Sequence, residues 1–279
     1  MLRIVTDMAC DLATGWKEQY QIDSIPLNII VDGKSYLQGV DLCDEEFYQY
    51  IATTGKIPLT SQPTPPQFID FYRKVAKKGD SVLSIHVSQK LSGTLNSAEQ
   101  AAQELSGEIH VIPYDSTNGT ICAGMMCKEA RILDKAGASI DRILRRMDEI
   151  RSNMKLVITI DDLKFAQLSG RVRLLEATMA SLLQIKPIIE LKDGMIEVTG
   201  NVRSRAKAIE AMLINLKEKM GDQRIHAGIV HVRDRVSADS LCKEVLNRFN
   251  CIDIAVTEVS IALAAHFGPG ALGLAAYPE

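Results

Sequence analysis

The chain has 279 residues, of which 46% are hydrophobic and 24% are charged, and its formal net charge is -3. This length suits two medium domains or one large domain of a soluble globular protein. Without a basic excess to meet a phosphate backbone, we expect no nucleic-acid partner. No apolar run reaches the ~18 residues that span a bilayer, and the start, MLRIVTDMACDL, predicts a strand and not a signal peptide.

Six cysteines are present, and no two of them have the C-x-x-C spacing of a zinc or thioredoxin-like site. In a chain of this length the simplest interpretation is that the cysteines are buried as small apolar residues and that the protein is in a reducing compartment. We therefore expect a cytoplasmic protein with no metal site.

In the first half, short apolar runs alternate with helical patterns. The runs that predict strands are 2–5, 25–31, 82–87 and 109–112, and the predicted helices are 44–52, one beginning at Pro65, and 94–105. Thr64 precedes Pro65, and Gln67 follows three residues after Thr64, which is the pattern of a capped helix start. The alternation favours an α/β layer structure with a largely parallel sheet.

Two successive helical patterns, at about 117–135 and 139–152, separate this half from a second one. We expect the domain junction at these helices, with an N-terminal α/β domain, 1–153, and a C-terminal α/β domain, 154–279. The second domain is predicted to contain strands at 156–160, 225–232 and 252–256, helices at 173–185, 203–219 and 238–248, and a hairpin of 187–191 with 195–199 turned at Asp193-Gly194. The expected fold is two packed α/β domains with a ligand cleft between them.

Two polar motifs lie at predicted loop-to-helix boundaries of the first domain. TSQPTP places Thr60 and Ser61 before the capped helix, and SQKLSGT places Ser92, Gly93 and Thr94 between a buried strand and a helix. Free amides at such a helix start favour an anion, and ligands of open α/β sheets bind at this end of the strands. The alternative interpretation is an ordinary loop in the first motif and a helix cap at Ser92 in the second.

A third motif, AHFGPGALG, places His266 directly before a Gly-Pro-Gly turn in an apolar segment. A tight turn needs one glycine and no histidine, whereas a backbone approached by a ligand uses more glycine. His266 is therefore either a ligand-site residue or a histidine satisfied within the core.

The ordered set TSQP, LSGT, LSGR (168–171), RSR (203–205) and HFGPGALG resembles the DegV family of bacterial fatty-acid-binding proteins, over essentially the whole chain. The resemblance implies two α/β domains with one long-chain fatty acid between them. It implies that the fatty-acid carboxylate is held by Thr60, Ser61, Ser92, Gly93, Thr94 and His266.

The same resemblance implies that Arg171, near the pocket mouth, helps a kinase partner handle phosphate; the alternative is a surface ion pair. For Arg203 and Arg205 the first interpretation is that they lie on the surface of a helix, and the second is that they contact phosphate or a partner. The segment 174–185 is a candidate wall of the tail tunnel, with the protein core as the alternative. The chain departs from the family pattern at Met8, where a serine is usual, and at Ser169, where a glycine is usual.

The function implied is that of a binding subunit and not an enzyme: it takes a fatty acid from a membrane surface and presents its carboxylate to a separate ATP-dependent kinase that makes an acyl phosphate. The sequence contains no G-x-x-x-x-G-K-[ST] motif, so it should not bind ATP by itself. We expect no cofactor beyond the bound fatty acid. The alternatives are a serine hydrolase using Ser92, His266 and an acid such as Asp115, although the G-x-S-x-G elbow is missing, and a lipid-sensing regulator without a kinase.

Overall fold

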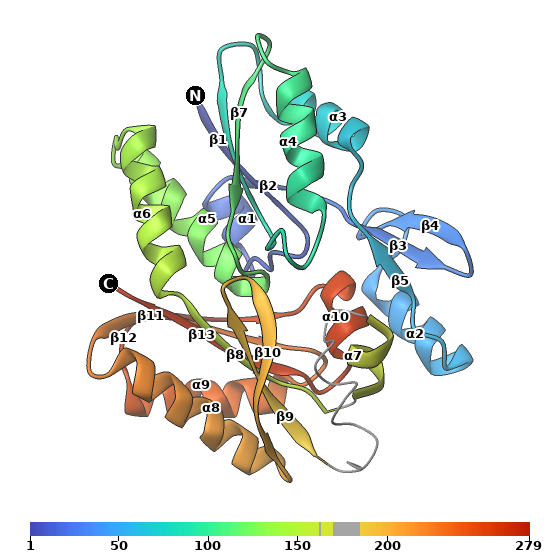
Figure 1. Ribbon diagram of the computed structural model, residues 1–279, viewed down its shortest axis with the longest axis vertical. Coiled ribbons are helices and arrows are strands. Elements are labelled where there is room, and N and C mark those ends of the chain that lie inside the picture. Colours follow the sequence, from blue (N-terminus) through green and yellow to red (C-terminus); the bar gives the residue numbers. More distant parts are fainter. Residues whose placement is uncertain (162, 170–184) are drawn as a thin grey trace. The chain divides into compact units, whose positions relative to one another are not determined.

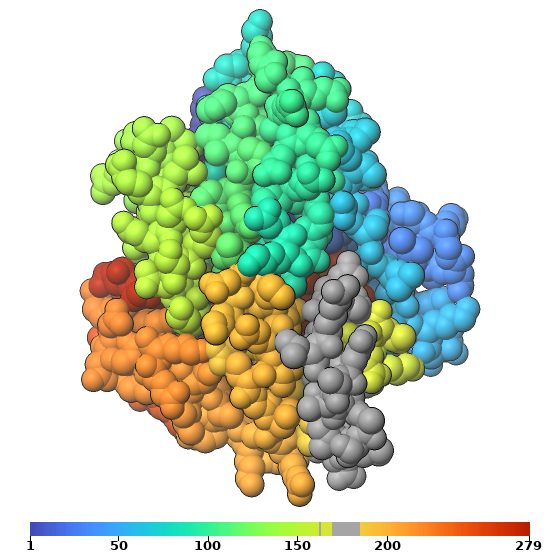
Figure 2. All heavy atoms as spheres, viewed as in Figure 1, coloured from blue at the N-terminus to red at the C-terminus, as the bar shows by residue number. Residues whose placement is uncertain are grey.

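The computed structural model describes residues 1–161, 163–169 and 185–279; residues 162 and 170–184 are grey in Figures 1 and 2. The helix expected at 173–185, the tunnel wall at 174–185 and Arg171 lie outside the described residues. The chain divides into two compact units, Met1–Glu149 with Ser260–Ala262 and Ile150–Val259 with Leu263–Glu279.

The first unit is built on a parallel sheet in the order β2-β1-β6-β7. Its strands are β1 (Leu2–Asp7), β2 (Ile22–Ile25), β6 (Ser81–His86) and β7 (His110–Asp115). Helices α3 (Pro65–Val75) and α4 (Thr94–Glu104) pack on one face, where Val5, Val82, Phe68 and Leu105 join one apolar core. Helix α5 (Thr120–Lys135) packs against β1 and β6 (Figure 1). The predicted parallel α/β layer is confirmed for this unit.

The helix starts of this unit follow from local chemistry. Thr64 caps α3 by accepting the Gln67 amide, and the Gln67 side chain accepts the Thr64 amide in return, so the predicted capping box is present. Ser139 accepts the amide of Arg142 at the start of α6 (Ile140–Asn153) and so caps this helix. Helix α1 (Trp16–Gln19) is a single turn that the apolar pattern did not indicate.

The strand expected at 25–31 is wrong as one element. Residues Ile22–Ile25 form β2 of the parallel sheet, whereas β3 (Asn28–Val31) belongs to a separate sheet with β4 (Lys34–Leu37) and β5 (Leu59–Ser61). Pro26 separates the two strands, and a proline cannot donate to a strand ladder. Helix α2 (Asp44–Thr54) follows β4 in the chain.

The second unit contains a six-stranded sheet in the order β10-β9-β8-β13-β11-β12. Its strands are β8 (Lys155–Thr159), β9 (Lys186–Lys192), β10 (Met195–Val202), β11 (Arg224–His231), β12 (Asn250–Glu258) and β13 (Leu272–Pro278). The hairpin turned at Asp193-Gly194 is confirmed. Helices α8 (Arg205–Met220) and α9 (Arg235–Arg248) bury an apolar core against this sheet, and the golden hairpin lies beside their orange atoms in Figure 2.

The second sheet is mixed, unlike the parallel sheet of the first unit. Among its described strands, β11 and β12 pair in parallel, whereas β13 inserts between β8 and β11 antiparallel to both. The cause is the last strand, which returns through the short helix α10 (Ile261–Phe267) and the Gly-Pro-Gly turn into the middle of the sheet. Helix α7 (Leu163–Ser169) and α10 were not predicted.

Candidate functional site

The candidate site of the first unit lies at the carboxyl edge of its parallel sheet. The chain runs from β1 to β2 on one side of β1 and returns to β6 on the other, so the connections diverge between β1 and β6. Ligands of open α/β sheets bind outside the strand ends at such a switch point. The segments that leave β1 and β6 there are 8–12 and 87–93, and the second of them carries Ser92.

Ser92 sits one residue before Gly93, which is the N-cap of α4. Its Oγ lies 2.8 Å from Oγ1 of Thr94 and accepts the Thr94 amide at 3.3 Å. Both interpretations of Ser92 therefore have a basis, because the hydroxyl supports the helix start and remains half-buried at the end that faces the sheet edge. The first-turn amides of α4 point toward the same end.

The structure brings the TSQ and LSG motifs together within this unit. Thr60 pairs with Ile29 in the β3–β5 ladder. A Cβ at position 93 would lie 2.7 Å from Cδ and Oε1 of Gln62, so the glycine allows the Gln62 amide to pack directly over the backbone of the LSG motif. Asn28 holds this arrangement by donating to the carbonyl of Gln62 at 2.9 Å.

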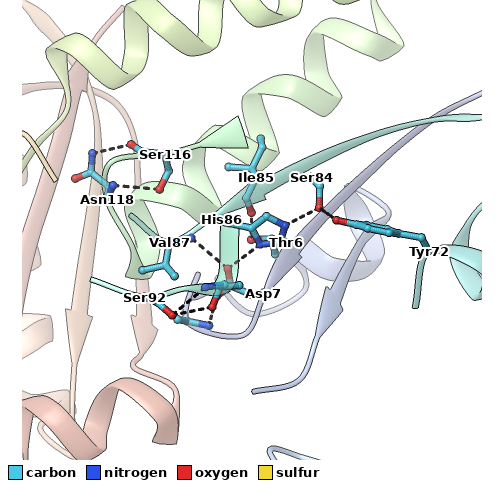
Figure 3. A network of polar contacts seen from close by, with 12 residues as sticks. Thr6, Asp7, Tyr72, Ser84, Ile85, His86, Val87, Ser92, Ser116 and Asn118 are labelled. Atoms are coloured by element: carbon cyan, nitrogen blue, oxygen red, sulfur yellow. Dashed lines mark hydrogen bonds and ion pairs between the residues drawn. The ribbon is translucent and has the colours of Figure 1, made fainter. Parts of the chain in front are cut away.

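A buried polar network lies behind this edge (Figure 3). The Asp7 carboxylate accepts Nδ1–H of His86 at 2.9 Å, and Nε2 of His86 lies 2.6 Å from Oγ of Ser84. Oγ of Ser84 lies 2.8 Å from the Tyr72 hydroxyl. All four side chains are buried. Of these four residues only Asp7 was singled out from the sequence, although Ser84 and His86 alternate with apolar residues in a buried strand, a pattern that places both on one face.

Asp7, His86 and Ser84 have the order of a hydrolytic triad, but their burial is unfavourable for that chemistry. Ser84 has no exposed surface, and its hydroxyl is engaged by Tyr72. A nucleophile must reach a substrate carbonyl. The buried network of Asp7, His86 and Ser84 therefore fits a structural role better than a hydrolytic one.

The triad considered from the sequence was a different one, with Asp115 as its acid. Asp115 accepts the amide of Thr117 at 2.8 Å in the turn after β7.

His266 belongs to the second unit, in the last turn of α10. The Gly268 amide donates to the Ala264 carbonyl, and Gly268 has a φ of 74° at a place where a Cβ would lie 2.6 Å from Cδ2 of Phe165. Gly270 donates to the Val232 carbonyl. Both glycines are thus required by positive φ and close packing, and they fix the chain on the C-terminal side of His266.

The structure places Arg205 beneath this turn. Its Nη1 donates to the Gly270 carbonyl at 2.8 Å, and its Nη2 donates to Asp234 at 2.6 Å. Asp161 also pairs with Arg205 and, more closely, with Lys186 at 2.6 Å. These contacts give Arg205 a role within its own unit. Arg203 is exposed between β10 and α8.

Asp11 is a second buried carboxyl at the sheet edge of the first unit. It accepts the Thr120 hydroxyl at 2.5 Å and the Ser260 amide at 2.9 Å, and Ser260 directly precedes α10. Burial raises the pKa of Asp11 to about 7, against the opposing effect of these hydrogen bonds. The folded protein therefore binds a proton at Asp11 more tightly than the unfolded chain does.

This shift predicts a pH-dependent stability. Because the folded pKa lies about three units above the ordinary value near 4, stability falls as pH rises from about 4 to 7, by at most roughly 4 kcal/mol. Asp11→Asn keeps an acceptor for Ser260 and carries no charge. We expect its Tm to exceed that of the wild type by several degrees at pH 8 and by much less at pH 5, in thermal melts at both values.

Asp193→Asn, in the exposed hairpin turn, is the matched control and should change Tm equally at both pH values. A pH-independent difference for Asp11→Asn would contradict the raised pKa.

Among the described residues, no helix is long and apolar enough to cross a membrane. Nor do the described His, Cys, Asp and Glu side chains form a group of three that could hold a metal ion.

The fold and the candidate site define a protein of two α/β units whose first unit presents hydroxyl groups at the edge of a parallel sheet. A model of the DegV family of uncharacterised proteins matches residues 1–279. The chain belongs to the DegV family.

Relatives of this family are similar over nearly their whole length. A DegV domain-containing protein of Listeria innocua is 32% identical over 278 residues, which cover 98% of this chain and 97% of the relative. One from Staphylococcus aureus is 33% identical over 272 residues, which cover 97% of this chain and 96% of the relative.

Solved structures of the family also match. A fatty-acid-binding DegV family protein of Thermus thermophilus is 31% identical with a TM-score of 0.91, and the match covers 100% of this chain and 99% of that one. A stearic-acid-binding protein of Eubacterium ventriosum is 25% identical with a TM-score of 0.88, and the match covers 100% of this chain and 98% of that one.

Proposed function

We propose that this protein binds a long-chain fatty acid and presents its carboxylate to a separate ATP-dependent kinase that forms an acyl phosphate. One observation carries the proposal: the hydroxyl-rich TSQ and LSG motifs meet at the start of α4 at the sheet edge. Related proteins of the same fold bind fatty acids.

The chemistry of the head group fits these motifs. A carboxylate accepts hydrogen bonds and donates none, so it needs donors such as hydroxyls and helix-start amides. We assign this role to Thr60, Ser61, Ser92, Gly93 and Thr94 in the first unit, and to His266 in the second. Hydroxyl and imidazole donors leave the oxygen less engaged than an arginine fork would, which suits a carboxylate that attacks a phosphate.

The acyl chain supplies most of the affinity in this proposal. Burying ~14 methylenes at roughly 0.8 kcal/mol each gives on the order of 11 kcal/mol before ordering costs. The polar groups then need only orient the carboxylate. Such a ligand is held at membrane surfaces in the cell, so the proposal includes transient contact with a membrane surface and action in the cytoplasm.

The partner side of the proposal uses the exposed basic residues. Arg203, and Arg171 outside the described residues, are proposed to contact the kinase or the transferred phosphate. For Arg205 the contacts with Gly270, Asp161 and Asp234 favour support of the turn after His266 as its first role.

Native mass spectrometry of the protein purified from its expression host tests this function. We expect a co-purified mass that matches a long-chain fatty acid and, with ATP and a purified bacterial fatty acid kinase, conversion of that mass to the acyl phosphate. Absence of any lipid together with turnover of an ester substrate would establish the hydrolase instead. Bound lipid that several such kinases leave unchanged would favour the lipid-sensing regulator.

A further inference from the structure

The buried network around Asp7 has no part in the ligand contacts proposed so far. The Asp7 carboxylate accepts three N–H donors: Oδ1 accepts the Ala9 amide at 2.9 Å, and Oδ2 accepts Nδ1–H of His86 at 2.9 Å and the Val87 amide at 3.1 Å. Asp7 ends β1 and His86 ends β6, so this carboxylate joins the two strands between which the chain connections diverge.

Val87 is the first residue of the segment that carries Ser92. The next residue, Ser88, donates its amide to the Asn118 carbonyl at 2.6 Å. The Ser88 carbonyl in turn accepts the amides of Leu91 and Ser92, at 3.0 and 3.1 Å. The position of Ser92 is therefore set by a turn closed on Ser88, and the anchor directly before that turn is the bond from Val87 to Asp7.

We propose that Asp7 is a positioning residue for the ligand head group: its buried carboxylate holds the Val87 amide and thereby sets where the Ser92 hydroxyl is presented. This inference rests on the proposed function. Asp7 itself does not contact the ligand. His86, held between Asp7 and Ser84, fixes the direction of the carboxylate, as a hydrogen-bonded partner fixes the geometry of a binding group.

A carboxylate is needed here because both of its oxygens accept N–H donors. Asparagine has one acceptor oxygen, so Asp7→Asn turns an amide NH₂ toward either the Ala9 amide or the pair formed by His86 and Val87. The substitution preserves volume and removes at least one of the three bonds. The effect on Ser92 is transmitted through Val87 and not through a change of the ligand pocket's shape.

The test uses palmitate labelled with ¹³C at the carboxyl carbon, added to delipidated full-length protein, and follows its carboxyl resonance through a pH titration. Weaker donation from Ser92 disfavours the charged form of the bound carboxyl. We expect Asp7→Asn to retain stoichiometric palmitate but to move the resonance and to raise the apparent pKa of the bound carboxyl by about one unit. A role in stability alone would lower Tm and leave this resonance unchanged.

A double-mutant cycle assigns the effect to Ser92. If Asp7 acts through Ser92, the Asp7→Asn/Ser92→Ala double variant shows the same carboxyl pKa as Ser92→Ala alone. The control is Tyr114→Phe, which should keep the wild-type resonance. It removes a part-buried hydroxyl that donates to Asp148 at 2.7 Å elsewhere in this unit.

Three results overturn the inference: a wild-type resonance in Asp7→Asn, additive effects in the cycle, or an equal shift in Tyr114→Phe. If Asp7→Asn does not fold, Asp7→Glu, which keeps the charge and adds one methylene, must shift the resonance. If neither variant folds, Asp7 is a folding residue and the inference is wrong. If palmitate keeps its free resonance in the presence of the wild-type protein, the proposed function itself is wrong. This outcome distinguishes failure of the proposed function from failure of the inference about Asp7.

Discussion

Replacing His266 by glutamine is expected to lower acyl phosphate formation by a factor of ten or more while the protein keeps its bound fatty acid. Glutamine can still donate a hydrogen bond, but it cannot carry a proton charge or reproduce the ring geometry. The orientation of an attacking oxygen affects rate steeply. The acyl chain makes the larger, apolar contribution to the binding free energy, and the substitution does not change it. The protein should therefore retain its ligand.

The surroundings of His266 make this substitution a local one. The residue lies in the last turn of α10, and the glycines at 268 and 270 hold the following chain through bonds to Ala264 and Val232. Those bonds are made by backbone atoms and are kept in the variant. We therefore expect a Tm near that of the wild type.

Thermal melting, ligand content by mass spectrometry and single-turnover acyl phosphate formation, measured on the same preparation, check this prediction. His110→Gln is the control: His110 is exposed on β7, where its Nδ1 lies 3.3 Å from the Ser81 hydroxyl, and its loss should leave turnover unchanged. A large fall in Tm with normal turnover per folded molecule would show that His266 serves the core.

Ser92→Ala is expected to weaken the anchoring of the head group by roughly 1.5–3 kcal/mol, the usual loss for a hydrogen bond to a charged group. This corresponds to about a 10- to 150-fold change. Kinase-coupled turnover should fall more than fatty-acid retention, because the hydroxyl orients the carboxylate and the acyl chain supplies the affinity.

The structure adds a second effect of this substitution. Ser92 accepts the Thr94 amide at 3.3 Å, so alanine also removes a side-chain bond to the first residue of α4, made from one residue outside the N-cap Gly93. Loss of a true N-cap costs about 0.5–2 kcal/mol of stability, and we expect no larger loss here. Ser139→Ala is the matched control, since Ser139 accepts the Arg142 amide at the same 3.3 Å at the start of α6.

We expect both alanine variants to lose a few degrees of Tm and only Ser92→Ala to lose turnover with a fatty acid kinase and ATP. Equal turnover in the two variants would show that Ser92 only supports the start of α4.

The interactions that the sequence predicted correctly are local ones. Thr64, Pro65 and Gln67 define a capping box within four residues, and Asp193-Gly194 define a hairpin turn between neighbouring strands. Their chemistry needs no partner from elsewhere in the chain, so it can be predicted from spacing alone. The family was also evident from the order of five short motifs, and the match over residues 1–279 confirms it.

By itself, then, the sequence determined the α/β class, the starts of α2, α3 and α4, and the family, because these depend on residues close together in the chain or on motif order. The tertiary structure decided that β13 runs antiparallel in the middle of the second sheet and that Arg205 supports the Gly270 turn. It also decided that Asp7 and His86, 79 residues apart, share a buried hydrogen bond. A buried carboxylate needs donors, but short-range patterns do not specify which donors folding brings to it.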